Sequence, residues 1–112
     1  MTTITRNLKM LAAVAVGLGL GWPAAAVAEP HELTVTMSNM SYGKLPTDAK
    51  VGDTIIWVNA DTVEHSVTAK DGSFDLRLLP GKRGRTVLKK AGNVAVYCVM
   101  HPTMRATLKV GS

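Results

Sequence analysis

Short apolar runs separated by turn signals are the feature that most constrains the fold of this chain. Residues 32–38 alternate apolar and polar side chains, the period of two expected of a strand with one buried face. Residues 54–59 form an apolar, β-branched run that predicts a central strand covered on both faces. Further short runs lie at residues 65–69, 86–88, 93–98 and 106–110. This pattern predicts an all-β protein, an antiparallel Greek-key β-sandwich of about seven or eight strands.

The segments between these runs are rich in glycine, proline, asparagine and charged residues. Residues 80–85 predict a basic loop, and residues 89–92 predict a hairpin turn that joins the runs on either side of it. Residues 74–79 fit either a strand or a loop that crosses between sheets.

The first 28 residues have the organisation of a signal peptide. Arg6 and Lys9 precede an uncharged apolar stretch, and the small residues 26–28 match what signal peptidase accepts. The alternative, an amino-terminal membrane anchor, is disfavoured because the stretch is short and is broken by Pro23. We therefore predict cleavage after residue 28, no stable membrane insertion afterwards, and one exported, periplasmic domain over residues 29–112.

The charge of the predicted mature part is only mildly positive. Of the 13 Lys and Arg residues, Arg6 and Lys9 fall in the leader, so 11 remain against 8 acidic residues, a net charge of +3. Aromatic residues are few and no recognition motif is present, so nothing indicates a nucleic-acid partner. The densest positive segment, residues 82–90, fits either a solvated face or a docking surface.

Cys98, His101 and Met104 place a thiol, an imidazole and a thioether within seven residues, between two of the predicted strands. Cys98 is the only cysteine, so it cannot form an internal disulfide in an exported protein. Thiolate, imidazole and thioether donors together suit copper better than magnesium or calcium. A trigonal copper site needs a second imidazole, and His65 is the candidate next to an apolar run. Two neighbouring strands could bring it over the loop.

This arrangement resembles the small blue copper proteins, the cupredoxins. The Cys-x-x-His-x-x-Met loop of residues 98–104 is most similar to the amicyanin branch. Residues 51–59, followed by His65-Ser66-Val67, are similar to the family's Gly-Asp-x-Val-x-Trp-x-Asn run and its first ligand histidine. The resemblance covers about residues 33–110.

The resemblance implies one type 1 copper ion, Cu(I) or Cu(II), bound by His65, Cys98 and His101 with Met104 as a weak axial ligand. It implies a one-electron carrier between redox proteins, not an enzyme, with transient docking of donor and acceptor near His101. We expect such a carrier to be a monomer. An alternative function is a periplasmic copper carrier or copper-resistance protein; a zinc protein or a copper enzyme explains the donors less well.

Two positions depart from the amicyanin pattern. Ser66 stands where the family commonly has asparagine, which predicts a shorter and weaker brace between the ligand loops. Met100 stands where amicyanin has proline, and its backbone N–H is expected to donate a hydrogen bond to the Cys98 sulfur.

Overall fold

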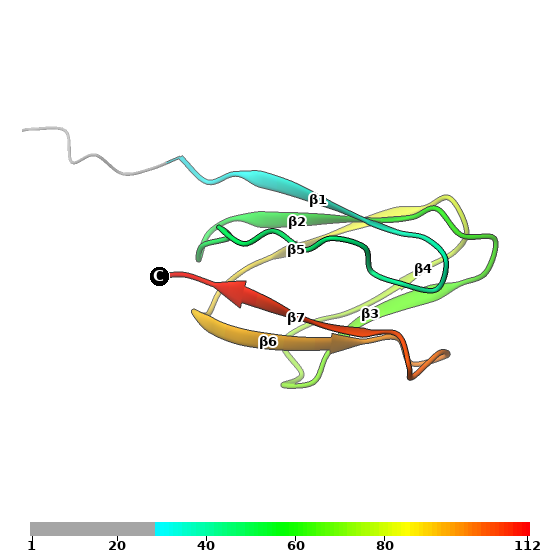
Figure 1. Cartoon of the computed structure of the whole chain (residues 1–112). Helices are drawn as coiled ribbons and strands as arrows, with labels where there is room; N and C mark the ends of the chain where they lie inside the picture. Colours follow the sequence, from blue (N-terminus) through cyan, green and yellow to red (C-terminus); the bar gives the residue numbers. More distant parts are fainter. Residues whose placement is uncertain (1–28) are drawn as a thin grey trace, which may run out of the picture.

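The computed structural model describes residues 29–112. The predicted signal peptide, residues 1–28, lies outside the described residues. The described part forms seven strands in two packed sheets (Figure 1). In chain order they are β1 (Glu32–Met37), β2 (Thr54–Asn59), β3 (His65–Ala69), β4 (Asp75–Leu78), β5 (Arg83–Val87), β6 (Gly92–Tyr97) and β7 (Arg105–Val110). The predicted all-β sandwich is confirmed.

The two sheets have the strand orders β1-β2-β5 and β4-β3-β6-β7. All pairs are antiparallel except β1 and β2, which are parallel. Two parallel neighbours need a long connection, and residues 38–53 provide it by returning the chain to the level at which β1 begins. The fold is therefore a sandwich dominated by antiparallel pairs, with one parallel pair at an edge.

Part of the predicted basic loop, residues 80–85, is a strand, because β5 begins at Arg83. Arg83 and Arg85 lie in β5 and face solvent, while the alternate residues face inward. A Cβ on Gly84 would lie 3.0 Å from Leu76 Cδ1, closer than an ordinary contact, so a larger residue there would require the Leu76 side chain of the facing sheet to shift. Residues 86 and 87 of β5 fall in the predicted run at 86–88, whereas residues 83–85 were missed because the inward residue there, Gly84, has no apolar side chain.

The predicted hairpin turn at residues 89–92 is also wrong. β5 belongs to one sheet and β6 to the other, so this segment crosses between the sheets. Residues 74–79, which fitted either a strand or a loop, contain β4.

Trp57 fills the centre of the sandwich and is fully buried. Its ring meets that of Tyr42 edge to face, with centroids 6.0 Å apart, and its Nε1–H donates to Thr86 Oγ1 at 2.9 Å. Both polar atoms of this aromatic pair are satisfied, since Tyr42 donates to Ser66 O at 2.7 Å. Burial raises the pKa of Tyr42. The core thus connects β2 and β5 with the start of β3.

Four connections gather at one end of the sandwich, at the right in Figure 1: residues 38–41, 60–64, 79–82 and 98–104. Asn39 N–H donates to Asp61 and joins the first two connections, and Asn59 N–H at the end of β2 donates to Lys82 O in the third. Within residues 29–112, no helix has the length and apolar character needed to span a membrane.

Candidate metal centre

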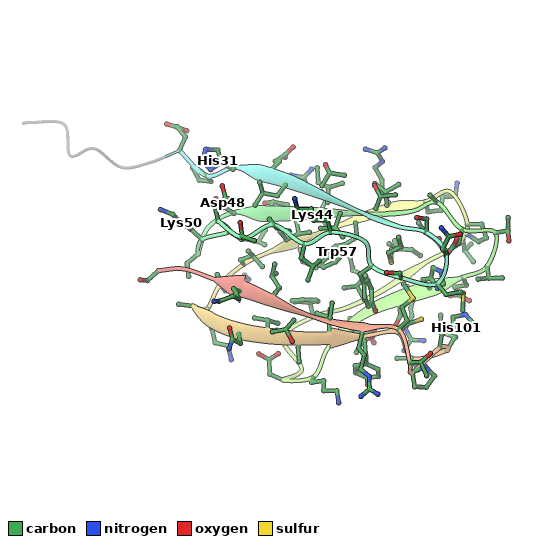
Figure 2. All side chains as sticks on the ribbon, in the orientation of Figure 1. His31, Lys44, Asp48, Lys50, Trp57 and His101 are labelled. Atoms are coloured by element: carbon green, nitrogen blue, oxygen red, sulfur yellow. The ribbon has the colours of Figure 1, made fainter. Side chains whose placement is uncertain are left out.

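The structure brings His65, Cys98 and His101 together at this end. His65 is the first residue of β3, and Cys98 directly follows β6, which pairs with β3. One ligand atom from each of the three side chains lies within 4.8 Å of the other two. Figure 2 shows His101 at the end of the sandwich and His31 at the opposite end, where the described chain begins. His31 is therefore not part of this group.

The three side chains differ in their access to solvent. His65 and Cys98 are 0% exposed, whereas His101 is half-buried. The two imidazoles meet edge to face with ring centroids 5.3 Å apart. An ion held here would be reached from outside on the His101 side.

Met104, the expected axial ligand, is buried in the core cluster. Backbone hydrogen bonds fold the loop on itself: His101 N–H donates to Cys98 O, Met104 N–H to His101 O, and Cys98 N–H to Met104 O. These donor–acceptor distances are 3.2, 2.8 and 3.0 Å. The loop is thus closed by hydrogen bonds within its own backbone.

Ser66 braces the two ligand segments. Its N–H donates to Cys98 Sγ at 3.3 Å, and its Oγ accepts the Val99 N–H at 2.8 Å. The brace expected to be weak therefore makes contact with both the sulfur and the loop. The prediction that Met100 N–H donates to the Cys98 sulfur is wrong. Among the described residues, the backbone N–H that donates to this sulfur is that of Ser66. The antiparallel neighbour β3, rather than the nearby loop, supplies the donor.

Asp61 is a residue that the sequence reasoning missed. Its Oδ2 lies 2.7 Å from His65 Nε2, and the carboxylate also accepts the N–H groups of Asn39 and Met40 at 2.8 and 3.0 Å. Asn39 and Met40 have positive φ angles of 52° and 59°, which turn both N–H groups toward the carboxylate. The hydrogen bond with His65, followed by that from Met40, lowers the pKa of Asp61. The sequence offered one signal for this role, because Asp61 is a carboxylate four residues before a candidate ligand histidine and such carboxylates often orient ligand imidazoles.

The Asp61 contact determines which ring nitrogen of His65 faces the site. With Nε2 held by the carboxylate, Nδ1 is left pointing at Cys98 Sγ, 3.8 Å away. A first-row ion of zinc's size sits about 2.0 Å from nitrogen and about 2.3 Å from sulfur, so a trigonal angle separates these donors by about 3.7 Å. The observed separation fits an ion between them. Copper is of similar size, and one thiolate with two imidazoles is its blue-site donor set.

Exposed apolar side chains concentrate at the end of the sandwich that carries His101. Six large apolar side chains are exposed in the described residues, and four of them lie on the loops at this end: Met40, Val63, Leu79 and Val99. Pro102 is also exposed, while Met100 is half-buried against the core. The exposed apolar side chains at this end thus come from four loops and not only from the loop that carries His101.

The basic segment does not form a single free cluster. Arg85 pairs with Glu32 across the sheet, and Lys90 lies 3.5 Å from Asp71. Two of its cations are therefore neutralised within the chain.

Comparison with known proteins reveals clear relatives. No protein-family model matches the chain. The methylamine utilization protein MauL of Methylorubrum extorquens is 34% identical over 116 residues, which span 100% of this chain and 97% of that protein. Amicyanin of Paracoccus denitrificans is 28% identical over 93 residues, covering 78% of this chain and 71% of that protein. Among solved structures, the Cu(I) form of an amicyanin variant superimposes with a TM-score of 0.63 at 27% identity, covering 80% of this chain and 90% of the other.

Proposed function

The chain belongs to the cupredoxins, a family of electron carriers rather than enzymes, and on that premise we propose that it shuttles single electrons in the periplasm through one type 1 copper ion. His65, Cys98 and His101 would bind the ion, with Met104 as the axial ligand. The observation that carries the proposal is the 3.8 Å separation of Cys98 Sγ and His65 Nδ1, both buried, within a group of three donors that His101 completes.

Copper, when bound, supplies a Cu(I)/Cu(II) couple that gains or loses one electron. The chain's contribution is to keep the donors in place in both states, because every movement of a ligand adds to the barrier for electron transfer. Asp61 holds His65 through Nε2, and Ser66 holds both the Cys98 sulfur and the Val99 N–H. Such outer hydrogen bonds orient ligands and tune their donor strength.

The alternative, a copper carrier or resistance protein, is less well supported. A protein that hands its ion on needs donors that a recipient can reach. Here His65, Cys98 and Met104 are buried, and only His101 is partly open to solvent. This arrangement favours an ion that stays in place while electrons pass.

We also propose a location and a process. The leader of residues 1–28 supports export to the periplasm, with cleavage after residue 28. The name of the relative from Methylorubrum extorquens supports a role in methylamine utilization. The redox donor and acceptor would dock transiently at the apolar end around His101, and a small apolar patch suits complexes that must separate quickly.

Copper loading tests the proposal. The protein with Cu(II) should show the intense visible absorption of a thiolate–copper bond, and Cys98→Ser should abolish it. His31→Ala is the matched control, because His31 lies outside the site and its loss should leave the colour unchanged. If the blue absorption survives Cys98→Ser, the proposed ligand set is wrong.

A second measurement separates the two candidate functions. An electron shuttle should complete repeated cycles of reduction and oxidation without losing its ion to a copper chelator. Release of most of the copper within a few cycles would favour the carrier function instead.

A further inference from the structure

A chain of three polar side chains runs along the outer face of the four-stranded sheet, from the metal-binding loop to the edge strand β4. Ser66 Oγ lies 2.9 Å from Thr68 Oγ1, and Thr68 Oγ1 lies 2.8 Å from Asp75 Oδ1. Ser66 and Thr68 are two residues apart on β3 and therefore share a face, and Asp75 is the direct cross-strand neighbour of Thr68. We call these three side chains the hydroxyl relay. It reaches the loop because Ser66 Oγ also accepts the Val99 N–H at 2.8 Å.

The direction of each hydrogen bond in the hydroxyl relay follows from the carboxylate at its end. The hydrogen bonds from Arg77, followed by that from Thr68, lower the pKa of Asp75, so at neutral pH its carboxylate is ionised and can only accept. A hydroxyl has a single proton, and that of Thr68 goes to Asp75. The bond between the two hydroxyls is therefore donated by Ser66. The other acceptor near the Ser66 hydroxyl, Tyr97 O, is farther away, at 3.5 Å.

This direction matters because a serine hydroxyl rotates to suit its partners. When the proton of Ser66 points to Thr68, the lone pairs of the Ser66 oxygen remain for the Val99 N–H. Without an acceptor for that proton, the same oxygen would be free to turn its lone pairs away from the loop. The ionised end of the relay strengthens the bond from Thr68, which in turn polarises the bond from Ser66. The exposed carboxylate of Asp75 thus acts on the loop through two hydroxyl groups.

We propose that Thr68 and Asp75 are positioning residues of the metal centre, which hold the Ser66 hydroxyl in the orientation that accepts the Val99 N–H. The inference rests on the proposed electron-carrier function, because the loop of residues 98–104 carries three of the four proposed ligands. Val99 directly follows the ligand that supplies the thiolate. A loop fixed at this point rearranges less when the oxidation state of the ion changes.

Exchange of the Val99 amide proton with water, measured by NMR on the 15N-labelled metal-free protein, tests the relay without any copper. Thr68→Val replaces the hydroxyl with a methyl group of similar size, and it should speed this exchange by about 3- to 10-fold relative to the amides of β6 and β7. Thr68→Ser keeps the hydroxyl and should restore the wild-type rate. Thr107→Val is the matched control, because it makes the same replacement on the same face of the sheet but outside the relay. An equal Val99 rate in Thr68→Val and Thr107→Val would overturn the proposal.

Asp75→Asn keeps the test decisive even if Thr68→Val does not fold. Asp75 is exposed on the edge strand β4, so its replacement leaves the core packing unchanged. A neutral amide oxygen accepts a weaker hydrogen bond than a carboxylate, so the Val99 amide should exchange about 2- to 3-fold faster. Asp48→Asn removes an exposed carboxylate outside the relay and should leave the rate unchanged. Equal rates in these two variants would also overturn the proposal.

Electron self-exchange between the Cu(I) and Cu(II) forms distinguishes a positioning role from a purely structural one. Its rate is measured from NMR line broadening in mixtures of the two forms. Thr68→Val should slow self-exchange by about 2- to 5-fold, less than the loss of a group that contacts a ligand directly, and Thr68→Ser should restore it. Self-exchange in Thr68→Val at the rate of Thr107→Val would make the relay a structural feature only and would overturn the positioning role.

The two proposals fail in different ways. Absence of blue copper would contradict the electron-carrier function, while the metal-free protein would still show whether the relay orients the Ser66 hydroxyl. Normal blue copper with unchanged Val99 exchange in Thr68→Val would contradict the relay alone.

Discussion

Removing the hydroxyl of Ser66 tests how strongly the site is held before any ion binds. Ser66 is fully buried, and its Oγ accepts the Val99 N–H at 2.8 Å. It also lies 2.9 Å from Thr68 Oγ1, which keeps its bond to Asp75 when Ser66 is changed. The main loss in Ser66→Ala is therefore one partner of one partly buried N–H group.

That loss sets the expected magnitude. A buried N–H group left without a partner lowers the free energy of unfolding by about 1–3 kcal/mol. Because the Val99 N–H is only partly buried, we expect Ser66→Ala to lower the free energy of unfolding by about 1.5 kcal/mol. In a domain of this size, each kcal/mol lowers the melting temperature by about 4–8 °C. We therefore expect the metal-free variant to melt about 6–12 °C below the wild-type protein. The backbone N–H of Ser66 still donates to Cys98 Sγ, so the copper-loaded variant should stay blue.

Thermal unfolding of the metal-free proteins, followed by far-ultraviolet circular dichroism, measures this effect. Ser41→Ala is the control, because the Ser41 hydroxyl accepts the Gly43 N–H at 3.2 Å on the exposed surface, where water can replace it. The control should change the melting temperature by less than about 2 °C. If Ser66→Ala melts no lower than Ser41→Ala, Ser66 does not brace the loop in the way that the hydrogen bonds indicate.

Two further predictions concern carboxylates. For both of them the control is Asp48→Asn, because Asp48 is exposed. Asp61→Asn should weaken copper binding by about 10- to 100-fold, measured by competition with a Cu(I) chelator, because the anion that orients the ligand imidazole is lost. The N–H groups of His31 and Lys50 lower the pKa of Asp53, so its stabilising effect is complete above its ordinary pKa of 3.8 and is lost as the pH falls through the lowered value. Asp53→Asn should therefore lower the free energy of unfolding at neutral pH, and this free energy should then fall less steeply with decreasing pH than in the wild-type protein. A decrease as steep as that of the wild-type protein would contradict this prediction.

Much of the fold could be predicted from local patterns. The alternation in β1, the β-branched run of β2 and the apolar spacing of β6 and β7 correspond to strands in the structure because side chains alternate between the faces of a sheet. Residues 83–85 of β5 could not be predicted this way. The inward residue there, Gly84, lies close to Leu76 of the facing sheet, and the next inward residue, Thr86, accepts the Trp57 N–H.

The same division holds for the site. The sequence by itself determined that the candidate donors Cys98, His101 and Met104 share one short loop, because their spacing is covalent. Only the tertiary structure decided that Ser66, rather than Met100, donates to the sulfur, and that Asp61 holds the far side of His65. These contacts join segments whose relative position depends on strand pairing and on the packing of the two sheets. Hydrogen bonds between such segments carry no local periodicity, so the sequence names the donors while the three-dimensional fold selects what orients them.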